Sequence, residues 1–177
     1  ITYRVSGGNG CTSSCNFTIT VNALPVVTTG TYGQVCIDAA DITLTGSPAG
    51  GTWSGTGVTG NSFDPSAGTQ TLTYTYTNGN GCTNSAQTTI TVNPLPIVTT
   101  GSYGPVCIDA AEITLTGSPV GGTWSGTGVT GNMFDPAAVT QTLTYTYTNG
   151  NGCTNSAQTT ITVNPSPTVD PVLNQIV

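Results

Sequence analysis

Residues 70–81, Gln-Thr-Leu-Thr-Tyr-Thr-Tyr-Thr-Asn-Gly-Asn-Gly, decide the fold class of this chain. Leu72, Tyr74 and Tyr76 alternate with threonines, which is the period-two pattern of a half-buried antiparallel strand. The Asn-Gly pairs that follow tolerate positive φ and are typical of a tight hairpin turn. Residues 88–92 alternate again, so this region is predicted to form a β-hairpin.

Shorter strand patterns lie upstream of the hairpin. Ile42 and Leu44 alternate with threonines, and residues 51–54 bring Trp53 toward the predicted core, where Tyr74 also lies. Turn signals recur about every 8–12 residues, and no useful stretch has helical periodicity. The pattern predicts an all-β chain of immunoglobulin-like β-sandwiches, each with six or seven strands.

The chain repeats itself with a period of 71 residues. Cys36, Trp53 and Cys82 recur as Cys107, Trp124 and Cys153, and Tyr74 recurs as Tyr145 in the second predicted core. Residues 24–93 and 95–164 differ at only eight pairs of positions. These pairs are Val26/Ile97, Thr31/Ser102, Gln34/Pro105, Asp41/Glu112, Ala49/Val120, Ser62/Met133, Ser66/Ala137 and Gly68/Val139.

This period predicts the domain organisation. Residues 1–23 match 72–94 and are expected to be the last strands of a preceding domain, followed by repeats at 24–94 and 95–165. Residues 166–177 are expected to hold a linker and the first strand of a following domain. Two prolines in four residues stiffen each boundary, so the repeats are expected to form a rod that advances about 35–45 Å per repeat.

Charge is scarce and acidic. The chain has seven acidic residues, one basic residue (Arg4), no histidine and a formal net charge of −6. A nucleic-acid site needs clustered Arg and Lys, and attraction to an anionic membrane needs the same, so neither partner is expected. A surface of hydroxyl and amide groups depends little on ionic strength.

Three stretches carry a resemblance to a known family. These are residues 44–58 (Leu-Thr-Gly-Ser-Pro-Ala-Gly-Gly-Thr-Trp-Ser-Gly-Thr-Gly-Val), 76–86 (Tyr-Thr-Asn-Gly-Asn-Gly-Cys-Thr-Asn-Ser-Ala) and 89–94 (Thr-Ile-Thr-Val-Asn-Pro). The chain resembles the Ig-like/PKD-like tandem repeats of giant secreted Bacteroidota proteins over residues 1–167. The resemblance implies adhesins and surface filaments exported by the type IX system, while the fold alone does not settle the role.

The six cysteines favour an oxidising, extracellular setting, because such a pattern is rare in cytosolic proteins. We favour disulfides within each repeat, Cys36–Cys82 and Cys107–Cys153. The alternative joins Cys36 to Cys153 of the following repeat. Cys11 and Cys15 are expected to close a small local loop, or else to bond an upstream residue and another chain respectively.

Candidate chemistry is sparse. Residues 55–60 and 126–131 fit Gly-x-Gly-x-x-Gly, but no helix follows, so we interpret them as turns rather than dinucleotide sites. Without histidine, a Ser-His-Asp triad is impossible. Asp38, Asp41 and Asp64 are weighed as calcium ligands, but turn capping is the preferred interpretation for Asp38 and Asp41. No catalytic residue, metal or cofactor is expected.

These observations predict a structural module rather than an enzyme. We expect a repeat of a large extracellular filament, stalk or hook with an adhesive role, attached to a bacterial surface. Its partners would be neighbouring domains of the same chain and, in a multi-stranded filament, identical chains. One alternative is a glycan-binding or cell-surface-binding adhesin module with the Asn-Gly hairpins and the turns of residues 53–58 as the ligand edge. Another is an accessory domain of a secreted enzyme.

Overall fold

The structure, a computed structural model, describes residues 1–168. Within that range every regular element is a strand or a short 3-10 turn, and no helix is long and apolar enough to cross a membrane. The expected first strand of a following domain, within 166–177, lies largely outside the described residues.

The first repeat and the segment before it contain twelve strands and one 3-10 turn. They are β1 (Thr2–Ser6), β2 (Thr12–Asn16), β3 (Thr28–Thr29), β4 (Val35–Cys36), β5 (Ile42–Thr43), β6 (Gly46–Ser47), β7 (Thr52–Ser54), β8 (Val58–Thr59), β9 (Ser62–Phe63), η1 (Pro65–Ala67), β10 (Gln70–Thr77), β11 (Thr83–Ile90) and β12 (Val92–Asn93).

The second repeat contains the matching set of elements. They are β13 (Thr99–Thr100), β14 (Val106–Cys107), β15 (Ile113–Thr114), β16 (Gly117–Ser118), β17 (Thr123–Ser125), β18 (Val129–Thr130), β19 (Met133–Phe134), η2 (Pro136–Ala138), β20 (Gln141–Thr148), β21 (Thr154–Ile161) and β22 (Val163–Asn164).

The chain divides into two compact units that interleave in sequence. Unit 1 contains Ile1–Tyr32, Ile42–Asp64 and Thr71–Thr89. Unit 2 contains Gly33–Asp41, Pro65–Gln70 and the chain from Ile90 onward. Residues 33–41 therefore belong to the same unit as the second repeat, although they precede most of the first repeat in sequence. The predicted domain boundaries at 94 and 165 stay predictions.

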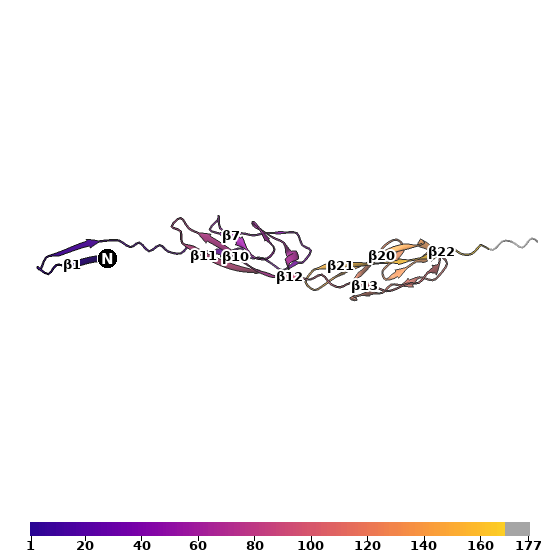
Figure 1. Cartoon of the computed structure of the whole chain (residues 1–177). Helices are drawn as coiled ribbons and strands as arrows, with labels where there is room; N and C mark the ends of the chain where they lie inside the picture. Colours follow the sequence, from indigo (N-terminus) through magenta and orange to yellow (C-terminus); the bar gives the residue numbers. More distant parts are fainter. Residues whose placement is uncertain (169–177) are drawn as a thin grey trace, which may run out of the picture. The chain divides into compact units, whose positions relative to one another are not determined.

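Unit 1 contains the hairpin that the sequence predicts. Strand β10 pairs with β11 on one side and with β7 on the other (Figure 1). In the pairing with β7, Tyr74 lies opposite Trp53. Leu72 and Tyr74 are buried while the threonines between and beside them keep solvent exposure, which confirms the predicted alternation at these two residues, whereas Tyr76 stays partly exposed. The remaining sheets are β5–β9–β8, β3–β6 and the separate hairpin β1–β2.

Unit 2 has the same pairings around β20. The sheets are β17–β20–β21, β15–β19–β18 and β13–β16, and every pairing in them is antiparallel. Two further pairs are parallel: β4 with β12, and β14 with β22. These parallel pairs place each early cysteine beside the asparagine that ends a repeat, with Cys36 opposite Asn93 and Cys107 opposite Asn164.

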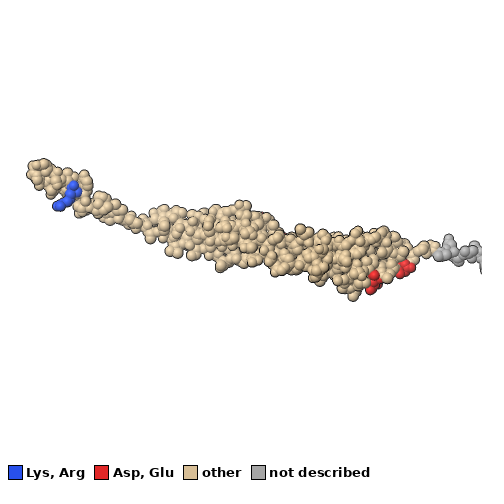
Figure 2. All heavy atoms as spheres, turned by 90° about the horizontal axis from the view of Figure 1, so that it is seen from below, with Lys and Arg blue, Asp and Glu red and all other residues tan. Residues whose placement is uncertain are grey.

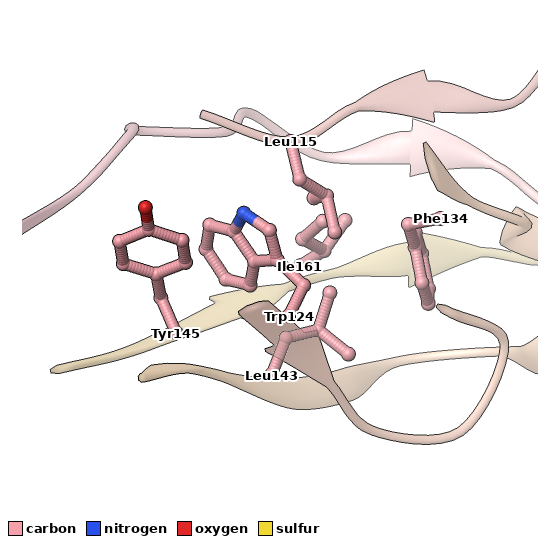
Figure 3. Packing of buried hydrophobic residues seen from close by; sticks show 6 residues of the cluster. All are labelled: Leu115, Trp124, Phe134, Leu143, Tyr145 and Ile161. Atoms are coloured by element: carbon pink, nitrogen blue, oxygen red, sulfur yellow. The ribbon is translucent and has the colours of Figure 1, made fainter. Parts of the chain in front are cut away.

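The core of unit 2 joins side chains from two of these sheets (Figure 3). It consists of Leu115, Trp124, Phe134, Leu143, Tyr145 and Ile161, all at most 8% exposed. The rings of Trp124 and Tyr145 pack with centroids 5.1 Å apart. Tyr145 Oη donates a hydrogen bond to the carbonyl oxygen of Pro119 at 2.6 Å and accepts one from Gly122 N at 2.8 Å.

Unit 1 places Trp53 and Tyr74 in the same way, with ring centroids 5.1 Å apart. All four aromatic side chains expected in the cores are therefore buried, at 8% exposure or less. The all-β class is confirmed. The immunoglobulin-like sandwich stays a prediction, because the strands form many small sheets of two or three strands.

The surface is almost free of charge on the face shown in Figure 2, where few acidic side chains and the single basic residue, Arg4, stand out from uncharged residues. Threonine hydroxyls pair across the hairpin of unit 2, with Oγ1 atoms 2.9 Å apart for Thr142 and Thr160 and 2.8 Å apart for Thr148 and Thr154. Cross-strand pairs of this kind stabilise a sheet, so these threonine side chains have a structural role in the hairpin.

Candidate functional site

The most prominent covalent feature of the chain is a disulfide between Cys36 and Cys153, with Cα atoms 5.6 Å apart. Cys36 belongs to the first repeat and Cys153 to the second, and both lie in unit 2. The structure thus contains the alternative pairing and not the favoured one. Cys82 and Cys107, the expected partners within the repeats, are free.

The geometry of unit 2 explains why a repeat does not close its own disulfide. Cys153 lies in the loop of the β20–β21 hairpin, next to the pair Thr148–Thr154. Cys107 lies opposite Asn164, beyond the far end of that hairpin. Eight residues of strand at about 3.3 Å each separate the two ends by about 26 Å. A disulfide needs Cα atoms within about 7 Å, so Cys107 cannot reach Cys153.

Parallel pairing with β12 holds Cys36 in place. Val35 N donates to Thr91 O at 3.1 Å, and Ile37 N donates to Asn93 O at 3.0 Å. The Asn93 side chain donates from Nδ2 to Gln34 Oε1 at 3.1 Å. The cysteine therefore lies beside the first residue of the linker that leads into the second repeat.

An asparagine side chain shapes the loop that carries Cys153. Asn149 Oδ1 accepts hydrogen bonds from Asn151 N and Cys153 N, each at 3.0 Å. Such Asx turns let a side chain replace a backbone acceptor in a tight loop. Gly152 has a φ of +80°, a conformation that glycine adopts at no steric cost. The loop holds Cys153 at 1% exposure.

The same loop binds the linker. Asn149 Nδ2 donates to Pro94 O at 3.4 Å, and Asn155 Nδ2 donates to Pro96 O at 2.9 Å. Cys153 Sγ lies 3.9 Å from Asn93 O, which is a packing contact because a disulfide sulfur carries no proton.

These contacts define one structural device. We call the Cys36–Cys153 disulfide, the two asparagines Asn149 and Asn155, and linker residues 93–96 the clasp. Proline has no N–H to donate but keeps its carbonyl acceptor, and in this linker side-chain amides donate to the carbonyl groups of Pro94 and Pro96.

Unit 1 repeats the hydrogen-bonded part of the clasp. Asn78 Nδ2 donates to Ala23 O at 3.3 Å, and Asn84 Nδ2 donates to Pro25 O at 2.8 Å. The free thiol of Cys82 lies 3.9 Å from Asn22 O. Because the asparagines bind backbone carbonyl oxygens, alanine can replace the first proline of the linker without loss of the contact.

Cys11 and Cys15 do not close the expected local loop, since both thiols are exposed and free. Cys15 lies in the extended strand β2, opposite Tyr3. Four residues of extended chain separate the two cysteines by about 13 Å, which exceeds the reach of a disulfide.

The acidic residues do not gather into a metal site in residues 1–168, where no three His, Cys, Asp or Glu side chains lie close enough to hold an ion. Asp135, the counterpart of Asp64, caps η2 by accepting a hydrogen bond from Ala137 N at 2.9 Å. The capping predicted for Asp38 and Asp41 stays a prediction, and Asp135 has this role at a position where the sequence did not predict it.

No protein-family model and no curated protein matches the chain. Among solved structures, the chain is similar to a Ca²⁺-stabilised adhesin with which an Antarctic bacterium reaches out and binds ice. That match has 13% sequence identity and a TM-score of 0.43, and it covers 94% of this chain. The chain spans 57% of the length of that structure. A similarity at this level carries no argument about function.

Sequence reasoning missed the role of the asparagine side chains. The glycines of the motif Asn-Gly-Asn-Gly-Cys-Thr-Asn at 149–155 predict a turn, but they do not indicate what the asparagine side chains bind. The available signal was the pair of asparagines on either side of a cysteine, which places two amide donors next to one sulfur atom. Nothing local to the motif identifies the linker as their acceptor.

Proposed function

We propose that this chain is a structural module of a large extracellular filament, stalk or hook with an adhesive role on a bacterial surface. The observation that carries the proposal is the clasp, in which a disulfide joins residues of consecutive repeats and two amides bind the linker between them. A filament module has to transmit tension along its chain, and a covalent bond across a linker serves that task.

The proposed extracellular location rests on the same bond, because disulfides persist in oxidising compartments and are rare in the cytosol. The nearly uncharged surface supports a role that is insensitive to ionic strength. Export from a bacterium of the Bacteroidota by the type IX system remains an expectation from the resemblance of the repeats.

The ligand-binding alternative gains no support from the hairpins. Four of the hairpin asparagines, Asn78, Asn84, Asn149 and Asn155, each donate an amide N–H to a backbone carbonyl group of a linker. These donors are therefore engaged within the chain. We retain the module as a spacer and load-bearing element, with neighbouring domains of the same chain as its partners.

Stretching single molecules with optical tweezers tests the load-bearing role. The disulfide spans 117 of the 177 residues, so a fully unfolded chain pulled by its ends exposes only about 60 residues to force. At about 3.5 Å per residue, the oxidised chain should extend to roughly 210 Å and the reduced chain to roughly 620 Å. The double variant Cys36→Ser/Cys153→Ser should extend fully without reductant, while Cys107→Ser should behave like the unmodified chain. Equal extension of the oxidised and reduced chains would contradict the proposal.

Mass per unit length of the native material, measured by electron microscopy, tests the assembly. One repeat per roughly 40 Å of axis, the advance expected from strand rise, would indicate a single-chain stalk. Several chains per repeat would indicate that identical chains pack side by side into the filament wall.

A further inference from the structure

The clasp in this chain has a matching half on the second repeat. Strand β14 pairs Cys107 with Asn164 as β4 pairs Cys36 with Asn93, and Ile108 N donates to Asn164 O at 2.9 Å as Ile37 N donates to Asn93 O. The linker sequence Asn-Pro-Leu-Pro at 93–96 recurs as Asn-Pro-Ser-Pro at 164–167. The early cysteine, its parallel pairing and a linker with asparagine and prolines at the same positions are thus present a second time.

The two halves differ in what covers them. In the closed clasp, Cys36 and Asn93 are partly buried and Cys153 is 1% exposed. In the second half, Cys107 and residues 164–167 are all exposed, and the Cys107 thiol is free. Equivalent residues are therefore partly buried by the hairpin loop in the first repeat and exposed to solvent in the second.

The opposite half of the clasp is also present with a free thiol. Asn78 and Asn84 bind linker residues 23 and 25 as Asn149 and Asn155 bind residues 94 and 96. Cys82, the counterpart of the disulfide-bonded Cys153, is free and partly exposed. Its thiol lies near Asn22 O, at the same 3.9 Å that separates Cys153 Sγ from Asn93 O.

We propose that Cys107 and linker residues 164–167 form a docking site for the Asn-Gly-Asn-Gly-Cys-Thr-Asn hairpin of another repeat of this kind. Cys82 and its two asparagines form the complementary half, which receives the early cysteine of a preceding repeat. The partner at both ends is a further repeat with the chemistry of this chain. This inference rests on the proposed function, because it treats the chain as part of an array.

An array built in this way has overlapping disulfide loops. The loop closed by Cys36 and Cys153 contains both Cys82 and Cys107, so the bond made by each of these residues begins inside it and ends outside it. Each disulfide loop therefore shares part of its backbone with the next loop along the array. Tension passes through disulfides and short connecting segments, and unfolding one repeat releases little length.

Disulfide formation needs an oxidant, for which a small-molecule disulfide such as glutathione disulfide suffices. The Cys107 thiolate attacks one sulfur atom of the oxidant and releases one glutathione thiolate. The hairpin cysteine then displaces the second glutathione from the mixed disulfide. Two protein thiols become one disulfide, and two glutathione thiols take up their protons.

The test is a chain of residues 1–167 followed by a copy of residues 97–167, refolded with reduced and oxidised glutathione and digested without reduction for mass spectrometry. We expect Cys107 to be bonded to the copied Cys153. The original Cys36–Cys153 bond serves as an internal control for folding. In the 177-residue chain four thiols are free, and thiol titration of the extended chain should give the same number.

The matched control is Cys107→Ser in the extended chain, which should show one thiol more than its parent. Original and copied peptides have the same mass, so the variant identifies the partner: a Cys107–Cys153 peptide pair that persists in the variant joins the two copied residues and would overturn the proposal. A free thiol on Cys107 of the parent while Cys36–Cys153 is intact would also overturn it. Either result leaves the stretching test of the 177-residue chain unaffected, so failure of this inference is distinguishable from failure of the proposed function.

Discussion

Removal of the Cys36–Cys153 disulfide should strongly lower the free energy of unfolding of this chain. The double variant Cys36→Ser/Cys153→Ser leaves no unpaired partner thiol. The bond closes a loop with a sequence separation of 117 residues. In the chain-entropy description, cross-linking over that distance lowers the free energy of folding by about 5 kcal/mol relative to the open chain. This value applies when the whole loop unfolds together, and it is the upper end of the expected loss.

Equilibrium unfolding in guanidinium chloride, followed by tryptophan fluorescence, measures this loss. The double variant should unfold at a lower denaturant concentration, and reduction of the unmodified chain should give the same shift. Cys82→Ser and Cys107→Ser are matched controls, since both residues are free, and each should change the free energy of unfolding by less than about 0.5 kcal/mol.

Two outcomes would refute this reasoning. If Cys82→Ser destabilised the chain as much as Cys36→Ser, the disulfide would lie within a repeat, and the parallel pairing of β4 with β12 would not determine the partner. If the double variant unfolded like the unmodified chain, the disulfide would not constrain the unfolded state.

Two further predictions concern the second repeat. Tyr145→Phe should lower the free energy of unfolding by about 1–3 kcal/mol, measured by denaturant titration, because Pro119 O and Gly122 N both lose a buried partner; an unchanged midpoint would contradict this. Val139 has φ +60° and ψ −173°, a region populated almost only by glycine, and the first repeat has Gly68 there. Val139→Gly should raise the free energy of unfolding by about 1 kcal/mol, because the relief of backbone strain exceeds the entropy that glycine adds to the unfolded chain. Gly68→Val should lower the free energy of unfolding of the chain. A destabilised Val139→Gly variant would show that the backbone at Val139 is not strained.

Much of the fold could be predicted from the sequence because it is encoded locally. The alternation of Leu72 and Tyr74 with threonines depends only on neighbours along the strand, and the structure shows the same alternation in burial. The burial of Trp53 and Tyr74 could also be predicted, since a large apolar side chain on a strand flanked by polar residues turns toward the core, whereas their contact across β7 and β10 depends on the strand order.

The disulfide partner could not be predicted in the same way. Cys36 pairs with Cys153 because a two-residue parallel contact places it at the end of its repeat, and no local pattern encodes so short a strand. The spacing of Cys36 and Cys82 within one period made a pair inside the repeat attractive. Only the length of the hairpin, about 26 Å in extended chain, argues against that pair once the strand order is known.

The eight positions at which the repeats differ show how the two copies keep one structure while their surfaces diverge. All of these positions retain some solvent exposure in both repeats. Ser62 and Met133 are each next to a fully buried phenylalanine, but successive residues of a strand point to opposite faces, so the larger side chain does not disturb the core. One of the eight differences, Gln34/Pro105, changes a contact of the clasp. Gln34 Oε1 accepts a hydrogen bond from Asn93 Nδ2, whereas Pro105 has no side-chain acceptor for Asn164. The backbone pairing that positions the cysteine is the same in both repeats, so the geometry of the cysteine does not depend on this contact.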